Sequence, residues 1–187
     1  MDIYLIRHTS VDVPKGLCYG QSDVSLANTF EKEAIGVKTK LPDNQRDIDL
    51  LTSPLSRCSL LVDFLFPEKL VRNDKRWMEM NFGNWEMKLW NDIPEEESQL
   101  WMRDFVNVAT PNGESFSEMI ERVKSVWEET LQQSTNDKVI VCHGGVIRTI
   151  LHLILEIPAQ KVFAVDIDYG AVIKIQYQYG FFKVKFL

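Results

Sequence analysis

The sequence predicts an α/β fold built around a mostly parallel central sheet. Three apolar runs end at polar side chains, and helical patterns lie between them; the runs fall in residues 3–8, 50–57 and 139–145. Unbroken apolar runs are typical of strands buried on both faces of a parallel sheet, because helices cover both faces there. A chain of 187 residues is expected to form one domain, residues 1–187, with a real core.

The first strand opens the chain, and two helices are predicted before residue 68. The apolar run over 3–6 lacks the basic start and the cleavage site of a signal peptide. A helix that ends near Pro42 is predicted over 30–41, because apolar residues recur there at i, i+4, i+7 and i+11. A second helix over 56–66 is rich in leucine and phenylalanine and is closed by Pro67.

Two further helices are predicted in the second half of the chain. One begins with a capping box formed by Ser115 and Glu118 and carries apolar residues at helical spacing. The other follows two glycines and runs over 146–155, stopping before Pro158. The helices and strands therefore alternate along most of the chain.

Two segments depart from this alternation. Residues 86–110 are rich in tryptophan, methionine and acid, and we expect them to form a short helical cap insertion beside the site; a plain amphipathic surface helix is the alternative. Residues 170–187 alternate apolar and polar side chains around Tyr179 and Gly180, which predicts a hairpin at a sheet edge. Lysines there would discourage aggregation.

Composition excludes several classes of function. The net charge is −6 and the pI is about 5.1, so the chain has no global attraction for nucleic acid or anionic lipid. No run of 18 apolar residues predicts a membrane span. The three cysteines are far apart and lack the spacing of a zinc site, so we expect unpaired thiols and a cytoplasmic location.

Four cationic or titratable side chains are predicted at one edge of the sheet. Arg7 and His8 follow the first strand, Arg57 follows the second, and His143 follows the third. Ligands of such sheets lie beyond the carboxyl ends of the strands. Guanidinium groups match phosphate oxygens, and neighbouring cations keep an imidazole neutral and nucleophilic. The cluster therefore predicts phosphoryl transfer to His8 without a metal ion.

A proton donor for the leaving group is also needed. Glu79 lies in an apolar and aromatic segment, where burial and a nearby phosphate favour a protonated carboxyl group. Glu86 and Glu114 compete for this role.

These motifs, in this order, resemble those of the histidine phosphatase superfamily. The matching segments are residues 7–9, 53–57, 79–86, 113–115 and 143–145. The resemblance implies a three-layer α/β/α sandwich, a phosphohistidine on His8, and a phosphate pocket made by Arg7, Arg57 and His143. It also implies that Glu79 donates a proton and then accepts one from water, and that neither a cofactor nor a metal is used.

Within that superfamily, residues 16–26 and 168–172 are similar to segments of α-ribazole phosphatases, which act on α-ribazole 5′-phosphate in cobalamin synthesis. The similarity implies that Gly20 and Gln21 lie at the pocket mouth. Thr9, or the hydroxyl that follows it, and Gly144 are expected to assist phosphate binding. The expected partner is a small phosphate ester, without nucleic acid or membrane; a homodimer is left open.

Two alternatives remain at this point. A phosphoglycerate mutase or a broad sugar-phosphate phosphatase would use the same chemistry, although a mutase usually needs a longer insertion to shield the phosphohistidine. A catalytically silent phosphate-binding module would need neither His8 nor Glu79.

Overall fold

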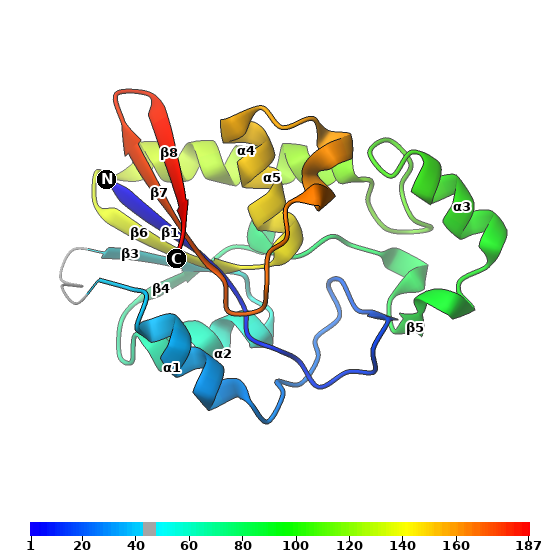
Figure 1. Ribbon diagram of the computed structural model, residues 1–187, viewed down its shortest axis with the longest axis horizontal. Helices are drawn as coiled ribbons and strands as arrows, with labels where there is room; N and C mark the ends of the chain where they lie inside the picture. The colour runs from blue at the N-terminus through cyan, green and yellow to red at the C-terminus, as the bar shows by residue number, and fades with distance from the viewer. Residues whose placement is uncertain (43–47) are drawn as a thin grey trace.

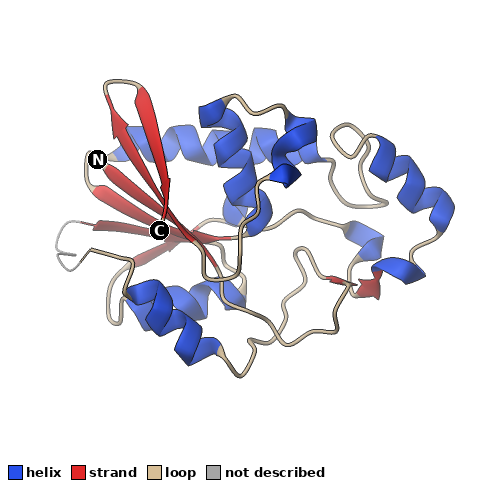
Figure 2. Cartoon of the chain, in the orientation of Figure 1, coloured by secondary structure: helices blue, strands red, loops and turns tan. Residues whose placement is uncertain are grey.

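The computed structural model describes residues 1–42 and 48–187, and it confirms the α/β fold (Figures 1 and 2). Six strands form one sheet in the order β4-β3-β6-β1-β7-β8. The first four in this order are parallel, β7 runs antiparallel to β1, and β8 runs antiparallel to β7. The strands are β1 (Asp2–Arg7), β3 (Ile48–Thr52), β4 (Val71–Asn73), β6 (Asp137–Cys142), β7 (Val172–Gln178) and β8 (Phe181–Phe186).

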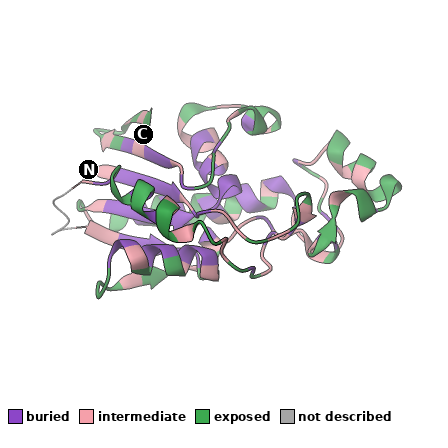
Figure 3. Ribbon diagram, turned by 60° about the horizontal axis from the view of Figure 1, so that its bottom comes forward, coloured by how far each residue is buried: buried purple, intermediate pink, exposed green. Residues whose placement is uncertain are grey.

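Helices cover both faces of the sheet, which gives the three expected layers (Figure 1). Helices α1 (Phe30–Lys38) and α2 (Ser56–Leu65) lie on one face, and α4 (Phe116–Gln133) and α5 (Gly144–Leu155) lie on the other. Side chains of a strand alternate between faces, so Ile3 and Leu5 of β1 enter the core under α4 and α5. Tyr4 and Ile6 enter the opposite core. Figure 3 shows that the central strands are largely buried, whereas the edge strands β4 and β8 are mostly exposed or intermediate.

Helix α1 ends three residues earlier than the apolar spacing predicts. It stops at Lys38. The N–H of Leu41 donates to the carbonyl of Lys38 over 3.2 Å, and this spacing of three residues is typical of a turn and not of an α-helix. Leu41 is nevertheless buried, because the turn carries it back onto the core. Periodicity therefore identified the buried residue correctly and the helix end wrongly.

Several local predictions are confirmed. The capping box of α4 is complete, with the Ser115 hydroxyl accepting from the Glu118 N–H and the Glu118 carboxylate accepting from the Ser115 N–H. Tyr179 and Gly180 both adopt positive φ, and they turn the chain between β7 and β8. Among the described residues, no helix is long and apolar enough to cross a membrane.

The segment over 86–110 projects away from the sheet and carries the expected helix, α3 (Glu95–Arg103) (Figure 1). A two-stranded sheet that the sequence did not predict precedes it, in which β5 (Lys88–Leu89) pairs with β2 (Leu17–Cys18). Both strands are too short for a visible apolar pattern. Short 3₁₀ helices complete the chain: η1 (Lys75–Trp77), η2 (Gly83–Trp85), η3 (Trp90–Asp92) and η4 (Ala159–Ala164).

Candidate active site

The carboxyl ends of three neighbouring strands meet at one edge of the sheet. Arg7, the last residue of β1, pairs with Cys142, and Thr52 of β3 pairs with Val141. The residues that follow these strands therefore begin side by side. As a result, the imidazole rings of His8 and His143 lie edge to face with their centroids 5.2 Å apart.

The His8 ring is buried and its tautomer is determined by the backbone. Its Nδ1 lies 2.7 Å from the carbonyl oxygen of Thr9. A carbonyl oxygen only accepts, so Nδ1 carries the hydrogen and Nε2 presents a lone pair. Burial, together with the charges of Arg57 and Arg7, lowers the pKa of His8 to about 3. The ring is therefore neutral at physiological pH, which is the state a nucleophile needs.

His143 is the residue before helix α5, and it is completely buried. Its Nε2 lies 2.8 Å from the hydroxyl of Ser53, which follows β3 directly, and 3.5 Å from the Cys58 thiol. Burial and the Arg57 charge hold the pKa of His143 well below its usual value. A second neutral imidazole thus lies beside the first.

Two guanidinium groups supply positive charge to this region. Arg57 is completely buried and donates to the carbonyls of Gly20 (2.6 Å) and Ser22 (2.9 Å). Arg7 lies 3.9 Å from the centroid of the Tyr169 ring. Within the described residues, neither arginine has a carboxylate within 4 Å, and the buried Nε of each lacks a hydrogen-bond partner. Such uncompensated charge favours a bound anion.

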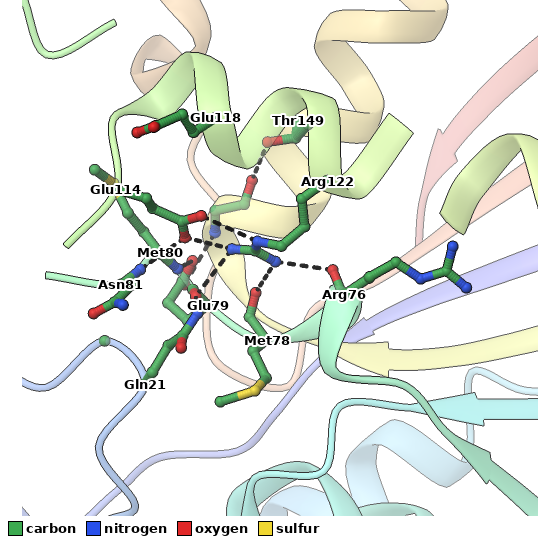
Figure 4. A network of polar contacts seen from close by, with 12 residues as sticks. Gln21, Arg76, Met78, Glu79, Met80, Asn81, Glu114, Glu118, Arg122 and Thr149 are labelled. Carbon is green, nitrogen blue, oxygen red and sulfur yellow. Dashed lines mark hydrogen bonds and ion pairs between the residues drawn. The ribbon is translucent and has the colours of Figure 1, made fainter. Parts of the chain in front are cut away.

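Glu79 contacts the first turn of α5, the helix that follows His143. Its Oε2 accepts from the N–H of Gly145 over 3.1 Å, and its Oε1 accepts from the N–H of Met80 over 3.0 Å. Figure 4 shows the polar network that surrounds it. A Cβ atom on Gly145 would overlap Oε1, so the second glycine of the Gly144-Gly145 pair is needed for this approach.

The structure separates Glu79 from its two competitors. Glu86 accepts from the N–H groups of Gln21, Ser22 and Phe82 and from the Ser22 hydroxyl, so its oxygens stabilise a loop. Glu114 forms an ion pair with Arg122. Among the three carboxylates, Glu79 lines the cavity that His8 also lines.

The cavity has a volume of about 190 Å³ and a lining of two chemical kinds. Arg7, His8 and Glu79 contribute charged or titratable groups to the lining. Most of the other lining residues are apolar or aromatic, with Tyr19, Phe82, Trp90, Phe116 and Phe163 among them. Arg148 also lines the cavity, and its Nε donates to the carbonyl of Val165 over 2.9 Å.

The remaining expected site residues lie at different distances from the cavity. Gly20 lines it. Gln21 instead donates its side-chain amide to the carbonyl of Glu79 over 2.9 Å, so it supports the segment that carries the carboxylate. Thr9 is buried, and its hydroxyl has no partner among the described residues. Gly144 is packed against the guanidinium groups of Arg7 and Arg148.

Sequence reasoning missed several residues here. Ser53 immediately follows the β3 strand, and this position was a usable signal. Tyr169 lies in the segment 168–172 that was singled out by resemblance, but no role was predicted for it. Arg122 carried no signal, because it reaches the site only through folding. Within the described residues, no group of three His, Cys, Asp or Glu side chains is arranged to hold a metal ion.

The sequence matches the family model described as histidine phosphatase superfamily (branch 1) over residues 3–187. A protein named "Putative phosphoserine phosphatase 2" from Hydrogenobacter thermophilus is 26% identical over 180 residues, which cover 92% of this chain and 88% of the relative. The adenosylcobalamin/alpha-ribazole phosphatase of Escherichia coli is 26% identical over 181 residues, 91% of this chain and 87% of the relative.

Among solved structures, the alpha-ribazole phosphatase of Shigella flexneri superposes with a TM-score of 0.91 at 25% identity, covering 100% of this chain and 96% of that chain. The mycobacterial glucosyl-3-phosphoglycerate phosphatase superposes with a TM-score of 0.83 at 19% identity, covering 99% and 97%. The second similarity concerns the fold alone.

Proposed function

Because the chain belongs to the histidine phosphatase superfamily (branch 1), we propose that it is a phosphomonoesterase that acts through a phosphohistidine on His8. The observation that carries the proposal is the state of the His8 ring. The Thr9 carbonyl holds the hydrogen on Nδ1, and the low pKa keeps the ring neutral, so Nε2 is a free nucleophile near two guanidinium groups that have no carboxylate partner among the described residues.

The proposed reaction has two steps. In the first, Nε2 of His8 attacks the phosphorus atom, the bond to the ester oxygen breaks, and the leaving oxygen takes a proton from Glu79. In the second, water attacks the phosphorus atom and gives a proton to Glu79, the P–N bond breaks, and inorganic phosphate leaves. His8 and the protonated Glu79 are thereby regenerated.

The charge of the transferring group would be stabilised by the protein's own cations. Arg7 and Arg57 present guanidinium forks, and the neighbouring His143 ring can donate once it is oriented by Ser53. These groups do the work that many phosphoryl-transfer enzymes give to magnesium. Activity should therefore survive exhaustive chelation.

We propose α-ribazole 5′-phosphate as the substrate. The E. coli and S. flexneri proteins with related names support this choice, as does the earlier similarity of residues 16–26. Aromatic rings in the lining of the cavity suit a flat heterocyclic leaving group, since stacked and edge-to-face contacts stabilise such rings. Reaction with water would release α-ribazole and phosphate.

Arg148 favours a second candidate, a phosphate ester whose leaving group bears a carboxylate. Its guanidinium has no carboxylate within 4 Å among the described residues, although it lines the cavity. Phosphoserine and 3-phosphoglycerate are esters of this kind. An arginine forms bidentate bonds with a carboxylate, so this cation would discriminate in their favour.

Comparison of kcat/KM for α-ribazole 5′-phosphate, phosphoserine and 3-phosphoglycerate tests the substrate. We expect the first to exceed the others by at least tenfold; a preference for either acid would support the second candidate. The same enzyme, quenched during turnover, should hold acid-labile phosphate that is absent from His8→Ala. A His8→Ala enzyme with full activity would disprove the mechanism.

A further inference from the structure

The segment that carries Glu79 is held by one guanidinium group, that of Arg122 on helix α4 (Figure 4). The Nη1 atom donates to the carbonyls of Arg76 (2.9 Å) and Met78 (2.8 Å). The Nη2 atom donates to the carbonyl of Glu79 over 3.2 Å. Three backbone carbonyls of one segment therefore converge on a single side chain.

The remaining donors of Arg122 meet a carboxylate that binds the same segment. Nη2 and Nε donate to the two oxygens of Glu114 over 2.5 and 3.1 Å. Glu114 in turn accepts from the backbone N–H of Asn81 over 2.8 Å. The pair thus contacts the chain on both sides of Glu79. Both side chains are largely buried, with 19% and 15% exposed, so water screens the pair little.

All five N–H groups of the guanidinium are used in this arrangement. A lysine offers three donors around one nitrogen and cannot reproduce the planar fork. The Glu79 carboxyl itself accepts from the N–H of Gly145 at the start of α5 and from the N–H of Met80 in its own segment. Its backbone is therefore held from α4, and its side chain is held from α5 and from the neighbouring residue.

We propose that Arg122 is a positioning residue for Glu79, holding its backbone so that its carboxyl reaches the ester oxygen. This inference rests on the proposed function, because it assumes that Glu79 transfers protons. None of the five donors of Arg122 bonds to His8, Arg7 or Arg57. Loss of the fork should therefore impair proton transfer and leave phosphate binding intact.

Leaving-group dependence distinguishes positioning from general support of the fold. An alkoxide must be protonated as it leaves, whereas p-nitrophenolate leaves readily without a proton. The ratio kcat/KM reports the steps up to release of the alcohol, so it isolates this proton transfer. A variant that misplaces Glu79 should lose kcat/KM for an alkyl phosphate and retain it for p-nitrophenyl phosphate.

The experiment compares Arg122→Lys with Glu79→Gln and with a matched control, Arg72→Lys. Arg72, in β4, also donates a hydrogen bond to a residue of α4, the side chain of Gln133, but it takes no part in the network around Glu79. For Arg122→Lys we expect kcat/KM to fall at least tenfold with an alkyl phosphate and less than threefold with p-nitrophenyl phosphate. Arg72→Lys should change neither value, and inhibition by inorganic phosphate should be unchanged in both.

Equal losses with the two esters, or no loss with either, would overturn the role of Arg122. If Glu79→Gln itself shows no leaving-group dependence, the proposed function fails instead, so the two failures are distinguishable. If the melting temperature shows that Arg122→Lys does not fold, Glu114→Gln is used in its place. Glutamine keeps the shape of the Glu114 side chain and removes its negative charge. We expect kcat/KM to fall about threefold or more with the alkyl phosphate and to be retained with p-nitrophenyl phosphate.

Discussion

Two ends of the site region differ in how their side chains are held. At the sheet end, beyond the carboxyl ends of β1, β3 and β6, the side chains of His8, Arg57 and His143 are at most 2% exposed, and their partners include backbone carbonyls. At the cap end, formed by the segment that carries Trp90 and α3, no residue of α3 is buried, and the aromatic rings contact mainly one another. We therefore expect substitutions at the sheet end to affect the proposed chemistry, and substitutions at the cap end to affect the choice of leaving group.

The largest effect should come from the buried end, with Arg57→Lys. Lysine cannot contact Gly20, Ser22 and a phosphate together, because it lacks the planar fork. We expect kcat/KM to fall about 10³-fold, the scale of losing preorganised donors to a developing charge. Arg103→Lys on exposed α3 is the matched control and should change activity less than twofold. Equal effects of the two substitutions would remove the distinction between the ends.

A second substitution tests the space beside Glu79. In Gly145→Ala the new methyl group overlaps Oε1, so the carboxyl must move away from the ester oxygen. We expect kcat/KM for an alkyl phosphate to fall about 10²-fold, as general acid catalysis is lost. Gly36→Ala, where nothing lies within 4 Å of the added atom, is the control. Steady-state rates that match the parent enzyme would show that Glu79 does not need this position.

The cap end should affect specificity and spare the chemistry. Trp90 stacks on Trp101, with centroids 5.9 Å apart, and lines the cavity. In Trp90→Ala we expect KM for α-ribazole 5′-phosphate to rise about tenfold, from lost aromatic contact. The kcat/KM for methyl phosphate should change less than threefold. A uniform loss with both esters would place Trp90 in the chemistry as well.

The smallest effect concerns stability at mildly acidic pH. The folded pKa of His8 is about 3 and that of His143 is also lowered, whereas the unfolded value is about 6.5. Between these values the unfolded chain binds more protons, so the free energy of unfolding falls as pH falls below about 6.5. Each histidine contributes a slope of up to about 1.4 kcal/mol per pH unit.

Urea denaturation at pH 7 and pH 5.5 measures this slope. His143→Gln should remove about half of the decrease, since one of the two buried imidazoles is gone. The carboxylates whose pKa is lowered, such as Asp49 and Asp74, titrate below this window and contribute little within it. If the free energy of unfolding of His143→Gln changes with pH as steeply as that of the parent protein, protonation of His143 does not contribute to the pH dependence of stability.

The edge of the sheet was predictable because it depends on short-range patterns. Arg7, His8 and His143 adjoin the ends of apolar runs, and parallel strands bring such ends together whatever the loops do. The capping box at Ser115 and the hairpin at Gly180 are local for the same reason. Residue chemistry favoured Glu79, which lies in an apolar and aromatic segment, but left Glu86 and Glu114 in competition; the resemblance strengthened the choice of Glu79.

Other features required the tertiary structure. Arg122 bonds to carbonyls that are 43 to 46 residues away, and backbone acceptors leave no signature in a sequence. Gln21 bonds to a carbonyl 58 residues away, although a place at the pocket mouth was predicted. The end of α1 was mispredicted because Leu41 returns to the core through a turn.

By itself, then, the sequence determined the layers, the meeting of two histidines and two arginines at one edge, and the family. Only the tertiary structure decided which ring nitrogen of His8 is free, how Arg122 holds the segment of Glu79, and which aromatic rings line the cavity. The physical reason is the separation along the chain of the groups that interact. Periodicity and strand pairing act through neighbouring residues, whereas pKa values and carboxylate partners depend on burial and donors brought together from distant parts of the chain.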